Sequence, residues 1–320
     1  MKFFARVAAA ALMVWAWQAS AQDYPTKTVR VIITFPAGSA TDIVGRIITQ
    51  KLTEMWGQNV VTDNRGGAGG SIGSAIGARA MPDGYTLIID SNAHTINPSI
   101  YAHLPYDTLK DFTDIASLSG TPNVLVLNLS SKIKTIGEFV ADARARPGKI
   151  NFASAGTGSG THLNLEKFKL ATHIDVVHVP YKATPEVLTD IIGGRMDTYF
   201  CPLSACLPFV RDGKLRGVAV SSAKRSSLLP SMPTIAESGV PGFEFMLWFG
   251  VWGPHGMPAA IVSKIGNDVE RAIASADTRE RLVALANEPM DVKPKDFGRY
   301  VRKELEENGR IVKAAGIKPQ

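Results

Sequence analysis

The chain has 320 residues and a net charge of +6. Lys2 and Arg6 belong to a predicted leader, and without them 33 basic residues face 29 acidic ones, a net charge of +4. This mild bias, without a dense Lys/Arg stripe, predicts neither nucleic-acid nor membrane binding. About 300 mature residues exceed the usual size of a single hydrophobic core, so we expect two lobes.

The N-terminal residues predict a secretory signal peptide. Lys2 and Arg6 carry positive charge, an apolar run from Val7 to Trp17 follows, and Ala19-Ser20-Ala21 supplies a small-x-small cleavage site. The apolar run is too short to span a bilayer, and no cysteine follows the cleavage site to carry a lipid anchor. We therefore expect residues 1–21 to be removed near Ala21 and the mature protein to lie in the periplasm.

Strand and helix patterns alternate at the start of the mature chain. The β-branched, apolar segments 29–35, 59–64 and 85–91 predict strands. Segment 42–56 predicts a helix, and a second, small-residue helix is expected after the Gly-rich segment 65–73, ending near Ala80. The β-α-β-α-β order predicts a parallel sheet with helices on both faces.

A second α/β series begins after residues 117–129, where the chain leaves the first lobe. Strands are predicted at 149–154, 174–181, 195–201 and 215–221, and helices at 136–148, 163–172 and 184–193. Thr184 is the expected N-cap of the last of these helices, with Pro185 at its first helical position.

A Pro-rich connection at 228–244 precedes an apolar strand around Trp248, which is expected to return to the first lobe. Helices near 259–275, 278–287 and 296–315 close the chain. We expect lobe 1 to comprise residues 22–122 and 238–320, and lobe 2 residues 123–237. A cleft between two such lobes typically binds a small molecule.

Four turns follow strands and lead into helices: Phe35–Asp42, Asn64–Gly73, Ser154–His162 and Tyr181–Pro185. In an open parallel sheet such turns lie at the carboxyl ends of the strands, where ligands bind. The first turns of the helices present free N–H groups and a positive dipole end. Several of them facing one cleft could hold a carboxylate without an arginine.

Other chemistries match the sequence less well. No segment fits the phosphate-binding G-x-x-x-x-G-K-[ST] pattern, and the two Gly-rich turns lack the third glycine of G-x-G-x-x-G at Ile72 and Thr161. Ser71 lies in a G-x-S-x-G motif, which leaves an exported serine hydrolase as an alternative, although "NRGGA" separates this serine from its strand. The six histidines form no spaced ligand pair, so we expect no metal.

The only cysteines, Cys201 and Cys206, do not make a disulfide framework. Two arrangements stay open, a local disulfide between them or two buried thiols. Pro202 and Pro208 indicate an irregular backbone around both cysteines, which favours the thiols.

Motifs in a fixed order cover nearly the whole mature chain. They are YPTKTVRVIITFPAGSATDIVGR (24–46), NRGGAGGSIG (64–73), ASAGTGSGTHL (153–163), VHVPYK (177–182) and LPSMPTIAESGVPGFE (229–244). By these motifs the chain resembles the periplasmic solute-binding receptors of tripartite tricarboxylate transporters, the Bug family. The resemblance implies an α/β, two-lobed, type II Venus-flytrap protein, each lobe a mostly parallel sheet flanked by helices. It also implies no enzymatic activity, no cofactor and no metal.

The resemblance further implies that loop amides and ordered waters hold a small carboxylate, usually a dicarboxylate, for delivery to membrane transporter subunits. We expect a monomer. The matching first-lobe positions are Phe35, Ala37, Gly38, Ser39, Thr41, Asp42, Asn64, Ser91, Asn92 and His94. The matching second-lobe positions are Ser154, Gly156, Thr157, Gly158, Thr161, His162, Tyr181, Lys182 and Asp197.

The chain departs from the family pattern at Ala37 and Ser39, where F-P-P-G-G is common, and at Ala183, which replaces a glycine. The ligand stays open among aliphatic dicarboxylates, tricarboxylates and aromatic dicarboxylates, with Phe35 and Tyr181 suited to a flat or apolar spacer. A ligand-binding component of a sensory system is a further alternative.

Overall fold

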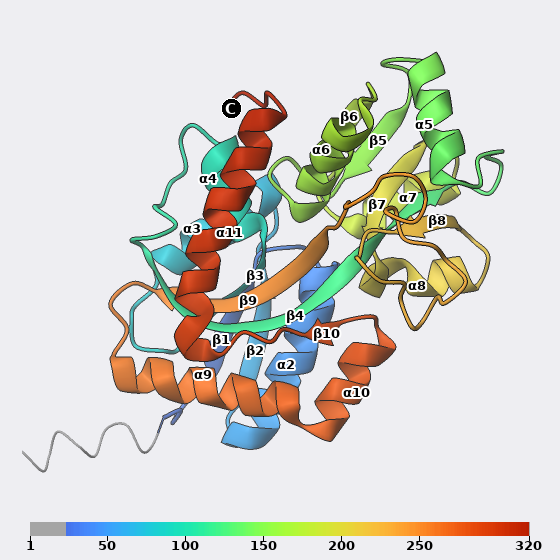
Figure 1. Cartoon of the computed structure of the whole chain (residues 1–320). Coiled ribbons are helices and arrows are strands. Elements are labelled where there is room, and N and C mark those ends of the chain that lie inside the picture. The colour runs from blue at the N-terminus through green and yellow to red at the C-terminus, as the bar shows by residue number, and fades with distance from the viewer. Residues whose placement is uncertain (1–23, 320) are drawn as a thin grey trace, which may run out of the picture.

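The computed structural model describes residues 24–319, so the predicted signal peptide lies outside the described residues. The protein has two lobes, each a sheet covered by helices on both faces (Figure 1). Within residues 24–319, no helix combines the length and the apolar character that crossing a membrane would require.

The elements follow the expected α/β order. The chain begins with β1 (Val29–Ile33), α2 (Ala40–Trp56), β2 (Val60–Asn64), the short 3-10 helix η2 (Ala68–Gly70), α3 (Ser71–Ala78), β3 (Thr86–Ser91) and α4 (Ala93–Ile100). It continues with β4 (Phe112–Leu127), α5 (Ile136–Ala145), β5 (Asn151–Ser154), α6 (Gly160–Thr172), β6 (Val177–Pro180), α7 (Thr184–Ile192), β7 (Thr198–Pro202), α8 (Leu203–Arg211) and β8 (Arg216–Val220). It ends with β9 (Met246–Pro254), α9 (Ala259–Ala274), α10 (Ala276–Ala284), β10 (Glu288–Pro289) and α11 (Pro294–Ala314).

The long strand β4 connects the two halves of the molecule. A path of hydrogen-bonded strands runs β2-β1-β3-β9-β4-β7-β5-β6, with β8 and β10 also paired to β4. Residues Phe112 to Pro122 of β4 pair with β9, and Asn123 to Leu127 pair with β7, both in antiparallel orientation. The strands β1, β2 and β3 are parallel to one another, as are β5, β6 and β7. Their carboxyl ends therefore carry the loops that the sequence singled out.

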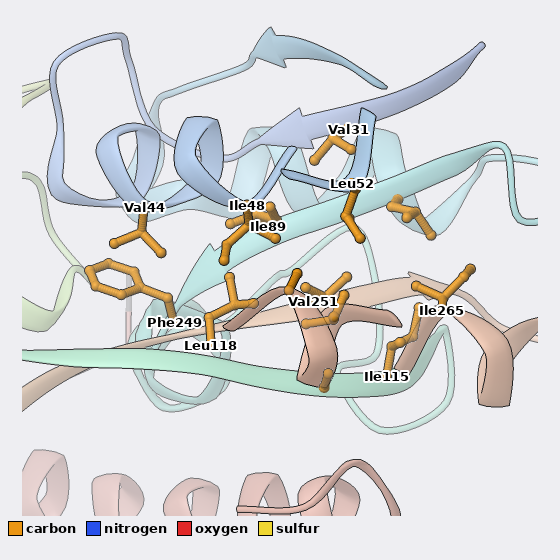
Figure 2. Close-up of a cluster of buried hydrophobic side chains, with 14 of the residues drawn as sticks. Val31, Val44, Ile48, Leu52, Ile89, Ile115, Leu118, Phe249, Val251 and Ile265 are labelled. Atoms are coloured by element: carbon orange, nitrogen blue, oxygen red, sulfur yellow. The ribbon is translucent and has the colours of Figure 1, made fainter. Parts of the chain in front are cut away.

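In the first lobe, the two faces of strand β9 contribute side chains to two separate hydrophobic clusters. Figure 2 shows Val44 and Ile48 of α2 close to Ile89 of β3 and Phe249 of β9, in a core that is closed off from solvent. The opposite face of β9 contributes Trp252 to a separate cluster with α3 and α11. Successive side chains of a strand point to opposite faces, so one strand serves both cores. Trp248 and Trp252 are both buried in this second cluster.

The C-terminal helix α11 contacts both lobes. Phe297 and Val301 near its start pack in the first lobe with Trp252. Near its end, Val312 belongs to a cluster with Ile100 of α4 and Phe168 of α6. Figure 1 shows this helix, in red, running along the molecule toward α4 and α6. The two lobes are thus joined by β4, by β9 and by this helix.

Two helices were not predicted, and one helix N-cap was predicted at the wrong residue. Helix α4 was not predicted, because its sequence is polar and contains Pro98. Helix α8 was not predicted either, since Pro202 and Pro208 indicated irregular backbone; Pro202 is in fact the N-cap residue of α8, and the helix accommodates Pro208. The N-cap of α7 is Ala183 rather than Thr184, which is already helical.

Candidate ligand-binding site between the lobes

The loop between β1 and α2 presents free backbone amides. Gly38 has φ +77, a conformation that favours glycine, and the next residue, Ser39, caps α2 with φ −71 and ψ 161. The Ser39 hydroxyl accepts the N–H of Asp42 at 3.2 Å. The N–H groups of Ala40 and Thr41 belong to the first helical turn and so have no acceptor within the helix.

The second lobe repeats this turn between β5 and α6. Gly158 has φ +83, and Ser159 caps the helix with φ −71 and ψ 159. The Ser159 hydroxyl accepts the N–H of His162 at 3.3 Å, which leaves the amides of Gly160 and Thr161 free in the first turn. Both turns have the sequence G-S-x-T, and the backbone angles of the two capping serines nearly coincide.

The third helical residue closes each turn. In the first lobe, Oδ2 of Asp42 accepts the Gly38 N–H at 2.9 Å. In the second lobe, Nδ1 of His162 accepts the Gly158 N–H at 3.3 Å. The two side chains hold the same backbone group, but one carries a negative charge.

The charge of Asp42 is compensated inside the first lobe. Its Oδ1 accepts Nε of Arg46 and Nδ2 of Asn64, both at 2.9 Å. The same Asn64 amide donates to the Phe35 carbonyl at 2.8 Å. The side chains of Asp42 and Asn64 therefore hold the loop in place through hydrogen bonds.

A cavity lies between the two turns. Its lining residues are Phe35, Ser39, Ala40, Thr41, Ser91, Ala155, Ser159, Gly160, Thr161, Thr184, Pro202 and Leu247. All but Phe35, Ala155 and Leu247 lie within, or at most two residues before, the first turns of α2, α4, α6, α7 and α8, and none of the lining residues is a lysine or arginine. Five helix N-termini from both lobes thus direct positive dipole ends at one space. Its volume is about 20 Å³, room for roughly one water molecule.

The apolar part of this site comes from Phe35 and Leu247. Phe35 is buried and packs with Ala93 of the first lobe and Ala155 of the second. The ring therefore stands where the lobes meet. Other hollows are larger, such as one of about 400 Å³ beside Pro122, but it is not lined by strand-to-helix turns.

Two neutral imidazoles support the second-lobe turn. Oγ of Ser154 accepts the Gly156 N–H at 3.1 Å and shares a second hydrogen bond of 2.6 Å with Nε2 of His178. The rings of His178 and His162 stack at 4.1 Å. Burial lowers the pKa of His162 to about 3, and burial together with nearby Lys169 lowers the pKa of His178 to about 4. Both rings thus hold the loop through hydrogen bonds, His162 to the Gly158 N–H and His178 to the Ser154 hydroxyl.

The predicted site residues fall into groups. Phe35, Ser39, Thr41, Ser91 and Thr161 line the cavity. Asp42, Asn64, Ser154 and His162 brace the turns, and Gly38, Gly156, Thr157 and Gly158 shape them. Asn92 is the buried N-cap residue of α4, and Ala37 is exposed at the rim. Tyr181 donates to Asp190 at 2.7 Å and Lys182 is exposed, so neither side chain lines the cavity.

His94 was expected to face the cleft, but its side chain points into the first-lobe core. Its ring is fully buried, 4.7 Å from the ring of Phe112 and 4.4 Å from that of Trp252. Neither ring nitrogen has a hydrogen-bond partner among the described residues, and burial lowers its pKa to about 3. The helical turn of α4, which the sequence did not reveal, rotates this side chain into the first-lobe core.

Asp197 lies at the end of the second sheet opposite to the ligand loops. It precedes β7, and its Oδ2 accepts the N–H of Asn151 at the start of β5. The strands β5 and β7 are parallel, so the ligand loops after Ser154 and Pro202 lie at the opposite edge. Asp197 is therefore remote from the cavity.

Several lining residues were missed. They are Ala40, Ala155, Ser159, Gly160, Thr184, Pro202 and Leu247. The repeat of G-S-x-T at 38–41 and 158–161 is a signal that could have indicated Ser159 and Gly160. Pro202 and Leu247 depend on how β7 and β9 meet in space, which sequence spacing does not contain.

The alternative chemistries gain little support. Ser71 is the first residue of α3, and no hydrogen bond joins it to an imidazole within residues 24–319. In the same range, no group of three or more His, Cys, Asp or Glu side chains is arranged to hold a metal ion. Cys201 and Cys206 are free, buried thiols.

A family model described as the tripartite tricarboxylate transporter family receptor matches residues 44–317. The chain belongs to this receptor family. Among curated relatives of this receptor, the protein BugT of Bordetella pertussis is 32% identical over 93% of this chain and 92% of its own length.

Solved structures of similar receptors agree with the fold. A protein of R. palustris, solved with adipate, is 34% identical with a TM-score of 0.89, covering 93% of this chain and 100% of its own. MatC from Rhodopseudomonas palustris, solved with bound malate, is 29% identical with a TM-score of 0.84, covering 90% of this chain and 100% of its own. Both bound molecules named in these structures are dicarboxylates.

Proposed function

We propose that this receptor captures a small organic carboxylate, a dicarboxylate in particular, in the cavity between its lobes. The observation that carries the proposal is the meeting of five helix N-termini at a space without a lining lysine or arginine. Free amides and dipole ends favour an anion, and the lack of a fixed cation suits a carboxylate held by several hydrogen bonds.

The two matching turns suggest how a dicarboxylate would be held. The amides of Ala40 and Thr41 would receive one carboxylate, and those of Gly160 and Thr161 the other. An anion gains about 0.3–1 kcal/mol per exposed helix end and up to about 2 kcal/mol when partly buried. Phe35 would contact the apolar spacer. The adipate and malate found with similar receptors are consistent with this ligand class.

Ligand entry requires the lobes to separate. A cavity of about 20 Å³ holds roughly one water, whereas a six-carbon diacid has about ten non-hydrogen atoms. We place the division between the lobes at residues 122 and 123, with residues 22–122 and 238–320 in lobe 1 and residues 123–237 in lobe 2. The change of partners along β4 from β9 to β7 supports this position.

The family points to a role in transport. We propose that the mature protein works as a periplasmic monomer, exported by the sequence that precedes Gln22, and delivers its ligand to the membrane subunits of a tripartite tricarboxylate transporter. A partner in a sensory system would use the same closed form. Deletion of the transporter subunits, with uptake of the identified ligand as readout, separates these roles: transport predicts loss of uptake.

Calorimetric titration of ligand-stripped protein tests the binding proposal. The probes are adipate and malate, with the neutral dimethyl ester of adipate and the cation 1,6-diaminohexane as controls of similar length. We expect at least one dicarboxylate to bind and both controls to fail. Equal binding of the ester, or no binding across a panel of mono-, di- and tricarboxylates, would contradict the proposal.

A further inference from the structure

The C-terminal end of α4 reaches across the cleft. The hydroxyl of Tyr101, the C-cap residue of α4, donates to the carbonyl of Thr157 at 2.9 Å. Thr157 belongs to the second-lobe anion turn and directly precedes Gly158 and Ser159. A first-lobe side chain therefore holds the loop that presents the second pair of free amides.

Asn97, one helical turn earlier in α4, contacts the same loop. Its Nδ2 donates to the Gly69 carbonyl at 3.1 Å, and its Oδ1 lies so close to Gly158 that a Cβ there would overlap it. Gly69 in turn abuts the Thr157 carbonyl, since a Cβ on Gly69 would overlap that oxygen. Three first-lobe residues thus enclose the short segment from Thr157 to Gly158.

These contacts depend on the relative position of the lobes. Tyr101 and Asn97 lie on α4, which packs on η2, α3 and β3 of the first lobe and on α11, and whose apolar side also contacts α6. Thr157 follows β5 of the second sheet. The turn also has an internal hydrogen bond, from Ser159 N–H to the Gly156 carbonyl at 3.0 Å, which would survive separation. Opening the cleft for a ligand would therefore break the Tyr101 contact and leave the turn itself intact.

We propose that Tyr101 is a positioning residue that latches the closed lobes onto the second-lobe anion turn. The latch deepens the proposed receptor function and rests on it for its biological meaning. It couples closure to binding, because the hydrogen bond to Thr157 forms only when the amides of Gly160 and Thr161 face the first lobe.

The test compares Tyr101→Phe with Tyr85→Phe. Phenylalanine keeps the ring of Tyr101, which packs with the second-lobe core, and removes only the hydroxyl. Tyr85 is the matched control, because among residues 24–319 its hydroxyl forms hydrogen bonds only with Thr26, at 3.1 Å within the first lobe. Spin labels at Met81→Cys in lobe 1 and Thr189→Cys in lobe 2, both exposed positions, report the lobe separation. The native thiols are buried and should not be labelled.

In ligand-free protein we expect Tyr101→Phe to shift the ratio of closed to open molecules about two- to tenfold toward open, the effect of one neutral hydrogen bond. Tyr85→Phe should leave the distances unchanged. Where adipate binds, its dissociation rate from Tyr101→Phe should rise by a similar factor with little change in association rate.

Identical label distances in wild type and Tyr101→Phe would overturn the latch, whether or not adipate binds. Absence of carboxylate binding to wild type would instead count against the proposed function, while the ligand-free distances still decide on the latch. An equal shift in Tyr85→Phe would also overturn it, because the effect would then be a general one of losing a hydroxyl.

Discussion

Asp42 and His162 perform the same structural task in opposite lobes with different charge. Each accepts the N–H of the glycine four residues before it, at 2.9 Å from Gly38 and 3.3 Å from Gly158. The carboxylate of Asp42 is offset by Arg46, whereas the imidazole of His162 is neutral. The positive end of α6 is thus unopposed by an acidic group at this position.

Replacing His162 should therefore reveal the charge of the second site. His162→Asn keeps a neutral acceptor for the Gly158 N–H, and His162→Asp keeps an acceptor but adds a negative charge beside the free amides. Both lose the stacking on His178 equally. We expect the Asp variant to bind adipate about 2- to 30-fold more weakly than the Asn variant at low salt, since a charge at a helix end is worth about 0.3–1 kcal/mol when exposed and up to about 2 kcal/mol when partly buried. Calorimetry that gives equal affinities would contradict this.

The methyl group added by Gly160→Ala should prevent the two lobes from approaching as closely as they do in the native protein. A Cβ at this helical position would overlap Asn92 Oδ1 and lie 2.5 Å from Leu247 Cδ1, both in the first lobe. Alanine is favoured over glycine in a helix by about 1 kcal/mol, so α6 itself should not be weakened. We expect at least tenfold weaker ligand binding with unchanged or higher thermal stability of the ligand-free protein.

The matched control is Gly137→Ala in α5, where the nearest atom to a new Cβ is 4.0 Å away. This variant should gain helix stability without loss of affinity. If Gly160→Ala binds as tightly as Gly137→Ala, the closed arrangement seen here is not the one that binds ligand.

Burial of His94 makes stability fall in acid. Its pKa is about 3 in the folded protein against 6.5 for a free histidine. Below pH 6.5 the unfolded chain takes up a proton that the folded protein refuses, so stability declines as the pH falls toward 3, by up to about 1.4 kcal/mol per pH unit. His94→Leu should make the decline between pH 6 and 4 shallower by about that amount in urea titrations.

At neutral pH the same variant should cost little, because leucine suits the rings of Phe112 and Trp252 and leaves no unpaired nitrogen. His103→Leu, at an exposed position, should leave the slope unchanged. A slope in His94→Leu equal to that of wild type would show that His94 is not responsible.

The two cysteines should be unreactive in the native protein. Both are fully buried, and burial with the neighbouring Cys206 raises the pKa of the Cys201 thiol, so little thiolate is available. We expect a water-soluble aromatic disulfide reagent to label neither thiol in buffer and both in denaturant without a reductant. Labelling in denaturant only after reduction would show a disulfide instead.

Much of the fold could be read from local patterns. The β-branched run before Phe35 and the glycines and capping serine that follow it indicate a strand-turn-helix without tertiary information. The anion turns could be predicted for the same reason, because Gly38 and Ser39 fix the backbone locally. Such positions show that turn chemistry is encoded in the residues themselves.

Other parts depend on packing and could not be read locally. His94 follows a strand, as a cleft residue would, but the short helix α4 turns it toward Trp252. Pro208 looked like a helix breaker, yet α8 continues through it, with Cys206 and Leu207 buried in the second-lobe core. Asp197 was placed by motif alone, and only the parallel pairing of β7 with β5 shows that it lies at the far edge.

A crystal structure of the protein with its tightest carboxylate would show whether the two helix turns hold the ligand. We expect carboxylate oxygens about 2.7–3.2 Å from the backbone nitrogens of Ala40 or Thr41 in one lobe and of Gly160 or Thr161 in the other. A ligand held by side-chain cations, or bound to one lobe without touching both turns, would contradict it.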